Sequence, residues 1–476
     1  MIARLVTCAL LAAASHAEAV SAGATYSLRY DARAETMAVR VCVPHAAQSL
    51  HFSADDGAER YIESLARDAA PAPVRDADGW SAANWRAGEC VSYRASLGTL
   101  ADAGRRSGGT RRGSVLVLDP ALWLLRVDEE SADADDARVD LPPGYMISAP
   151  WQAESRDGDT LSFRIPRTPD NWLARVAIGR FTEAPLALAG GTLRVSIVDG
   201  ADAAARTRLD AWLARVGSAA VSAYGTLPLA DVQVLVVPVG AAREPVEFGQ
   251  STRGQGHGLT LFVDATQPAS AFERDWVAVH EMSHLFHPYL GDRGSWLAEG
   301  LATYYQNVLR SRAGLLTPAE AWEQMDAGFA RGRGATREND SALERAAGVE
   351  GHPNFMRIYW SGTAFWLEAD LALRRASGNT LSVDEALKRF DACCLPDYRG
   401  WEPEAFVAKL DALVGGDVFR RTFDAYRARR DFPDLGASYR ALGISRDGAR
   451  LAFDDSAPDA SIRRAITSAA HRARDH

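Results

Sequence analysis

Two stretches of this 476-residue chain decide its fold: residues 276–288, WVAVHEMSHLFHP, and residues 295–305, SWLAEGLATYY. The first stretch contains the pattern His-Glu-x-x-His at residues 280–284. Two histidines four residues apart project from the same face of a helix, close enough for both imidazoles to bind one Zn²⁺. Taken alone, the pattern also fits an exposed polar helix face, so its surroundings decide between the two interpretations.

The surroundings of the first stretch predict a helix. Ser270 and Glu273 have the spacing of a capping box, and Pro288 cannot continue a helix, so we expect a helix from Ser270 to His287. Glu281 then lies beside the two histidines, where its carboxylate can accept a proton from a zinc-activated water.

The third metal ligand is expected from the second stretch. Glu299 follows His284 after 14 intervening residues and lies in a second expected helix, Ser295–Arg310. Two histidines and a glutamate, with a fourth position open for water, are typical of a catalytic zinc site. A metzincin would need Gly at position 287 and His at position 290, where this chain has His287 and Leu290. His287 remains the alternative ligand to Glu299.

At these residues the chain resembles the gluzincin metallopeptidases, and the glycyl aminopeptidase family more closely than aminopeptidase N. The resemblance covers residues 200–430 well and the N-terminal part only in general character. It rests on segments that match the family's second zinc helix, its Tyr-x-x-Gly helix and the Ser-Leu-Asp-Asp run after that helix: Trp296–Tyr305, Tyr359–Gly362 with Leu367–Arg374, and Thr380–Glu385.

The resemblance implies a hydrolase of peptide bonds that binds Zn²⁺ through His280, His284 and Glu299 and uses Glu281 as general base. It also implies that Tyr359, which lies 60 residues after Glu299, donates a hydrogen bond to the oxyanion of the tetrahedral intermediate. The alternative is a Tyr359 ring that only packs one helix against another. The competing phenols are Tyr289, Tyr304 and Tyr305. The alternative function is a catalytically silent binding or scaffold protein that keeps the peptidase fold.

Two features depart from the resembled family. Aminopeptidases of this clan hold the substrate amine with an acidic residue in a glycine-rich segment, yet residues 248–258, FGQSTRGQGHG, contain no carboxylate. We expect this segment to be either a hairpin loop or a cleft edge whose backbone pairs with an extended peptide. The segment after the expected catalytic domain, residues 431–476, is too short for the PDZ domain that many relatives carry.

The remaining sequence predicts a multidomain α+β protein. Short alternating runs predict a β-sandwich-like domain over residues 23–195, with strands that include Tyr26–Tyr30, Met37–Val43 and Thr192–Val198. A thermolysin-like, mainly helical zinc peptidase domain is expected over residues 196–430, followed by a tail. Its further helices include Ala203–Tyr224 and Tyr359–Ala376.

Composition and the N-terminal residues indicate which kinds of partner the protein can bind and where it is located. The net charge of -9 argues against nucleic-acid binding, and no apolar run after the leader reaches the length of about 18 residues that spans a bilayer. Residues 1–22 have the charge, apolar stretch and small residues of a signal peptide, which predicts a periplasmic or secreted protein. In such a compartment we expect a disulfide between Cys42 and Cys90, while the state of Cys393 and Cys394 stays open.

Overall fold

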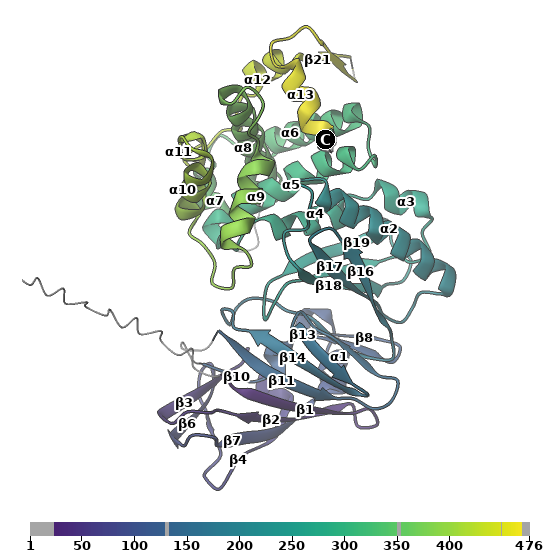
Figure 1. The fold of residues 1–476 in the computed structure, drawn as a ribbon, viewed down its shortest axis with the longest axis vertical. Coiled ribbons are helices and arrows are strands. Elements are labelled where there is room, and N and C mark those ends of the chain that lie inside the picture. The colour runs from purple at the N-terminus through teal and green to yellow at the C-terminus, as the bar shows by residue number, and fades with distance from the viewer. Residues whose placement is uncertain (1–22, 129–132, 350–353, 449, 469–476) are drawn as a thin grey trace, which may run out of the picture.

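The computed structural model describes residues 23–128, 133–349, 354–448 and 450–468. It has a β-rich N-terminal region and a mainly helical C-terminal region, so the chain is a mixed α+β protein (Figure 1). The expected signal peptide lies outside the described residues. None of the described helices is both long enough and apolar enough to cross a membrane.

Three sheets form the N-terminal region. Alternating side chains of β1, such as Tyr26 and Leu28, face a buried core, as the sequence pattern predicted. The seven-stranded sheet has the spatial order β13 (Gln152–Asp157), β14 (Thr160–Pro166), β11 (Ala134–Asp140), β1 (Thr25–Asp31), β2 (Thr36–Cys42), β7 (Cys90–Ser96) and β4 (Ile62–Arg67). One four-stranded sheet has the order β10 (Arg126–Val127), β3 (Ala47–Ser53), β6 (Gly79–Trp85) and β5 (Val74–Arg75). The other has the order β12 (Met146–Ser148), β15 (Val176–Gly179), β9 (Val115–Leu118) and β8 (Gly109–Arg112). The short helix α1 (Leu97–Asp102) follows β7.

Both cysteine pairs are bonded. Cys42 and Cys90 are directly paired across β2 and β7, and their disulfide confirms the pairing expected from the sequence. The sequence left the state of Cys393 and Cys394 open. In the structure these two neighbours form a disulfide at the end of α9 (Val383–Cys394).

A five-stranded sheet supports the helical region. Its order is β16 (Glu183–Leu188), β17 (Gly191–Ile197), β18 (Asp231–Pro238), β20 (Gly258–Val263) and β19 (Val246–Thr252). β19 is an edge strand and pairs antiparallel with β20. The expected strand Thr192–Val198 is therefore β17 of this sheet and does not pair with the N-terminal sheets. The domain boundary expected between residues 195 and 196 lies inside β17.

Helix α2 (Ala203–Val221) connects β17 to β18. The helices after β20 are α3 (Ala269–Arg274), α4 (Val277–Ser283), α5 (Ser295–Arg312), α6 (Pro318–Ala335), α7 (Leu343–Ala347), α8 (Phe355–Ala376), α9, α10 (Pro403–Val414) and α11 (Val418–Arg427). They confirm the expected helices near Ala203, Ser295 and Tyr359, with ends shifted by a few residues. The last part contains α12 (Gly436–Leu442), the hairpin of β21 (Ile444–Asp447) and β22 (Arg450–Phe453), and α13 (Ala460–Thr467). α13 packs on α5, where Arg312 donates to the carbonyl of Ile466.

Candidate active site

α4 carries the His-Glu-x-x-His pattern, but the expected single helix from Ser270 to His287 is wrong. α3 ends at Arg274, and Asp275 has an extended backbone, with φ -64° and ψ 143°. The carboxylate of Asp275 accepts the backbone N–H of Val277 at 2.8 Å and so caps a new helix. Aspartate competes for backbone donors in this way, which explains the break. The expected capping box at Ser270 does not form, because α3 starts directly after Pro268.

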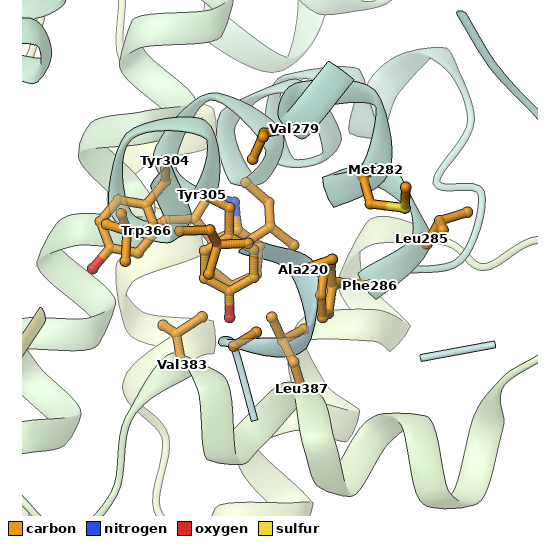
Figure 2. Packing of buried hydrophobic residues seen from close by; sticks show 14 of the residues in the cluster. Ala220, Val279, Met282, Leu285, Phe286, Tyr304, Tyr305, Trp366, Val383 and Leu387 are labelled. Carbon is orange, nitrogen blue, oxygen red and sulfur yellow. The ribbon is translucent and has the colours of Figure 1, made fainter. Parts of the chain in front are cut away.

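The buried face of α4 holds the helix in place. Val279 and Met282 of α4, with Leu285 and Phe286 just after it, point into the core that α2, α5 and α9 complete (Figure 2). His284 lies in a short 3-10 turn that continues α4. The opposite face presents His280 and Glu281 to a cleft.

His280, His284 and Glu299 lie together as the sequence predicted. Nε2 of His280 is 3.1 Å from Oε2 of Glu299, and Nε2 of His284 is 3.7 Å from the same oxygen. One ligand atom from each residue lies within 4.8 Å of the others, which is compact enough to surround one metal ion. α4 and α5 supply these groups from facing helices, and both histidines are buried.

The hydrogen bonds behind the histidines fit a metal site. Nδ1 of His287 lies 2.7 Å from the carbonyl of Pro288 and donates to it, so Nε2 of His287 accepts from Nδ1 of His284 at 3.1 Å. Nδ1 of His280 lies 2.9 Å from Oε1 of Gln306. These bonds leave a lone pair on Nε2 of His280 and of His284, as metal ligation requires.

His287 therefore stands behind a candidate ligand and not in place of Glu299. Burial, together with the charge of Arg253, lowers the pKa of His287 to about 3 and keeps its ring neutral. Arg253 donates to the carbonyls of His284 and His287 at 2.6 and 3.3 Å. It therefore supplies hydrogen-bond donors to carbonyl groups that lie after the end of α4. These roles of Arg253, His287 and Gln306 were not predicted from the sequence. Gln306 could have been found because it lies two helical turns after Glu299, and His287 was singled out only as an alternative ligand.

The two carboxyl groups of the site have opposite pKa shifts. Burial raises the pKa of Glu281 to about 7, although the backbone N–H of Ser251 donates to its Oε2 at 2.8 Å. Burial also opposes ionisation of Glu299, but the interactions of its carboxylate with His284 and His280 outweigh burial and lower the pKa of Glu299 to about 2. Carboxyl groups separated in this way suit one permanent anion and one proton carrier.

Each of the two expectations for the glycine-rich segment describes one part of it. Residues 248–252 belong to the edge strand β19 and line the cleft, and residues 253–257 form the hairpin loop between β19 and β20. A Cβ atom on Gly249 would lie 2.6 Å from Cγ1 of Val277 and 2.7 Å from Cγ of Glu281. Glycine thus lets the strand lie directly on α4. Two cavities of about 630 and 360 Å³ share β19, Glu281 and Tyr359 and together form the cleft.

Tyr359 of α8 lies beside the candidate ligands. Its ring is nearly parallel to that of His280 with 6.0 Å between centroids, and its hydroxyl hydrogen-bonds to Glu299. Tyr304 and Tyr305 instead donate to Asp370 and Asp384 at 2.9 and 2.8 Å, on the core side of α5 (Figure 2). Tyr289, whose ring contacts Trp172, lines the smaller cavity of the cleft, so it stays a competing phenol.

α5 and α8 touch through two glycines that follow the site residues. Gly300 comes directly after Glu299, and Gly362 comes three residues after Tyr359. A Cβ atom on Gly362 would lie 1.9 Å from the carbonyl oxygen of Trp296, and one on Gly300 would lie 2.4 Å from Gly362. The two helices can approach this closely only without these side chains, and the approach brings Tyr359 to Glu299.

Comparison with known proteins identifies the fold. No family model matches the chain, and no curated protein matches it. Among solved structures, an aminopeptidase N family protein from Idiomarina loihiensis has 14% identity and a TM-score of 0.67, with 88% of this chain and 78% of that chain covered. An M1 zinc metallopeptidase from Deinococcus radiodurans has 15% identity and a TM-score of 0.55, with 87% and 95% covered.

A third structure is a mutant of an M1 zinc metallopeptidase from Deinococcus radiodurans bound to a Tyr-Ser-Ala substrate. It has 16% identity to this chain and a TM-score of 0.57, with 87% of this chain and 96% of that chain covered. At these identities the likeness concerns the fold. The fold of this chain is therefore that of the M1 zinc metallopeptidases, a β-rich N-terminal region followed by a helical region.

Proposed function

We propose that the protein is a zinc-dependent peptidase of the gluzincin type, with His280, His284 and Glu299 as metal ligands. The observation that carries this proposal is the convergence of these three donors, with both histidines oriented by hydrogen bonds at Nδ1. The donor set suits Zn²⁺, for which two histidines and one carboxylate are a common catalytic site. The shared fold with M1 zinc metallopeptidases supports the same assignment.

The residues around the metal ligands have separate tasks in this proposal. A bound zinc ion would polarise the peptide carbonyl and lower the pKa of water. Glu281 takes a proton from the attacking water at its carboxylate and passes it to the leaving amine, for which a pKa of about 7 is well suited. The hydroxyl of Tyr359 donates to the oxyanion of the tetrahedral intermediate.

The edge strand β19 gives the substrate its place in this proposal. An extended peptide can pair with the free edge of β19, which lines the cleft along Phe248, Gly249 and Gln250. The substrate is therefore a peptide or an unfolded protein segment. No carboxylate in residues 248–258 is available to hold a free amine, so the proposal covers peptidase activity and extends to an aminopeptidase only if another group binds the amine.

The same proposal includes the finer points of organisation. We infer a thermolysin-like catalytic unit that starts before β16, because β16 and β17 belong to the sheet that carries β19. The likeness to glycyl aminopeptidases and the export expected from residues 1–22 stay parts of the proposal. A catalytically silent binding protein is the weaker alternative, because His280, Glu281, His284, Glu299 and Tyr359 are all present.

Digestion of a mixed peptide library by the zinc-loaded protein, read by mass spectrometry, tests the proposal. The Glu281→Gln variant is the matched control, because the amide has nearly the same shape but cannot accept the proton. We expect cleavage by the wild-type protein and loss of most turnover in the variant, with zinc content and melting temperature retained. Similar rates for both proteins would contradict the role of Glu281, and no cleavage by either would favour the silent protein.

A further inference from the structure

A further cavity, of about 560 Å³, lies beside the cleft and is lined by residues of α5, α6 and α8. Trp276, Tyr359 and Arg274 line both the cavity and the cleft, so a ligand can extend from one into the other. The charged side chains that line the cavity are Arg274, Arg310 and Arg331, and we call it the arginine pocket. No carboxylate is found among its described lining residues. In a chain with a net charge of -9, this is a local excess of positive charge.

Arg310 forms the buried base of the arginine pocket. Its side chain is 1% exposed and donates to the carbonyl of Arg274 at 2.7 Å and to Gln324 at 3.1 Å. It has no ion pair with any residue in the described part of the chain. The carboxylates of Asp275 and Glu320 are near enough to attract its charge, but both are engaged elsewhere. Asp275 caps the start of α4, and Glu320 belongs to the capping box of α6. A buried cation without an ion pair is costly, and a bound anion would offset that cost.

The exposed rim of the pocket adds two further guanidinium groups. Arg274 and Arg331 are exposed and, among the described residues, neither has an ion pair. Arg331 lies over the ring of Trp360 at 5.1 Å, which fixes its position. Guanidinium groups bind carboxylates through two parallel hydrogen bonds, so the rim suits a carboxylate better than a neutral group.

Neutral groups in the pocket favour a peptide over a simple anion. Thr303 and Asn307 lie one turn apart on α5, are at most 2% exposed, and have side-chain oxygens without a hydrogen-bond partner in the described structure. The amide oxygen of Asn307 needs a donor, which a peptide N–H offers and a simple anion lacks. Trp276 and Phe355, which are 45% and 49% exposed, form apolar walls for side chains.

The position of the pocket selects one side of the cleaved bond. A peptide antiparallel to β19 has its C-terminal part near Val246, and this end of the cleft also contains Trp276 and Arg274. We propose that the arginine pocket binds a carboxylate on the C-terminal side of the cleaved bond, either the terminal carboxylate or an acidic side chain. This inference rests on the proposed peptidase function and names the substrate class that the site prefers.

Alanine pentapeptides test the inference, because a single carboxylate can be placed in them at a chosen position. One ends in a free carboxylate, one in an amide, and further amides carry a single Glu at successive positions. Two measurements are made at low ionic strength: kcat/KM of the zinc-loaded protein, and calorimetric binding to the Glu281→Gln variant. We expect a preference of about tenfold or more for a peptide that carries a carboxylate over the plain amide. The free acid and the Glu peptides separate the two sources of that carboxylate.

Two variants locate the preference. Replacing both rim residues, Arg274→Gln with Arg331→Gln, is expected to remove most of the ratio between acidic and amide peptides. Both side chains are exposed, so the variant should fold. The control Arg33→Gln makes a charge change in the turn after β1, far along the chain from the pocket, and should keep the ratio.

The outcomes separate the inference from the proposed function. Cleavage without a preference for acidic peptides, or a preference that the rim variant keeps, would overturn the inference and leave the peptidase intact. Equal loss in the Arg33→Gln control would also overturn it, because net charge alone would then explain the effect. Charge-selective binding without any cleavage would instead support the pocket and reject the peptidase.

Discussion

The close contact between α5 and α8 makes the Gly362→Ala substitution a sharp test of how the site is assembled. A methyl group at position 362 would lie 1.9 Å from the carbonyl oxygen of Trp296 and 2.8 Å from Cα of Gly300, and both neighbours are backbone atoms that cannot rotate away. The helices must separate, which costs about 3 kcal/mol, at the upper end for overpacked cores. The higher helix propensity of alanine returns about 1 kcal/mol. We therefore expect a net loss of about 2 kcal/mol of unfolding free energy.

The same separation should reduce catalysis, because Gly362 and Gly300 follow Tyr359 and Glu299 on the two helices. A displacement of about 1 Å can cost about 100-fold in rate. Urea denaturation and steady-state kinetics measure the two effects.

The matched control is Gly334→Ala in α6, where a Cβ atom would meet nothing within 4 Å. This substitution should stabilise the protein by up to about 1 kcal/mol and leave kcat unchanged. If Gly362→Ala proved as stable and as active as the control, the close packing of α5 on α8 would be wrong.

Three further predictions concern Tyr359, His287 and Asp275. Tyr359→Phe should lower kcat about 100-fold or more with little change in KM or melting temperature. Tyr304→Phe should instead lower the melting temperature and keep kcat, because it removes a buried hydrogen bond. The reverse pattern in the kinetic and melting assays would show that Tyr359 is not the residue that donates to the oxyanion. His287→Ala should weaken zinc binding about 10- to 100-fold in a chelator competition, because His284 loses its orienting partner, and unchanged affinity would contradict that role. Burial raises the pKa of Asp275 from 3.8 to about 7. Between pH 3.8 and about 7 the folded protein therefore binds more protons than the unfolded protein, and the free energy of unfolding falls as the pH rises through this range. In Asp275→Asn this fall should be smaller when urea unfolding is followed from pH 4.5 to 7, and identical pH slopes would reject the shift.

The sequence predicted the residues that come together in the site because helical spacing and chemistry are both local. His280 and His284 must share a helix face, and Glu299 sits at the start of a helix that the flanking residues make evident. The sequence also predicted some strands of the N-terminal region, such as β1 and β2, since alternation of apolar residues survives in their burial.

Other features depended on contacts that no local pattern reveals. The break at Asp275 arose from a side-chain cap that competed with a continuous helix. β17 belongs to the five-stranded sheet because it pairs in parallel with β18, and this pairing is set only by the tertiary fold. His287 looked like a spare ligand, and only the hydrogen bond from His284 revealed its place behind the site. The arginine pocket combines residues from α3, α5, α6 and α8 with Trp276, so no single sequence motif predicts it.

Zinc content, measured on the purified, zinc-loaded protein after dialysis, tests whether His280, His284 and Glu299 form the metal site. We expect one Zn²⁺ per chain for the wild-type protein and for Glu281→Gln, and little retained zinc for His280→Ala, His284→Ala or Glu299→Ala. A wild-type protein without stoichiometric zinc, or histidine variants that keep it, would show that these residues are not the metal ligands.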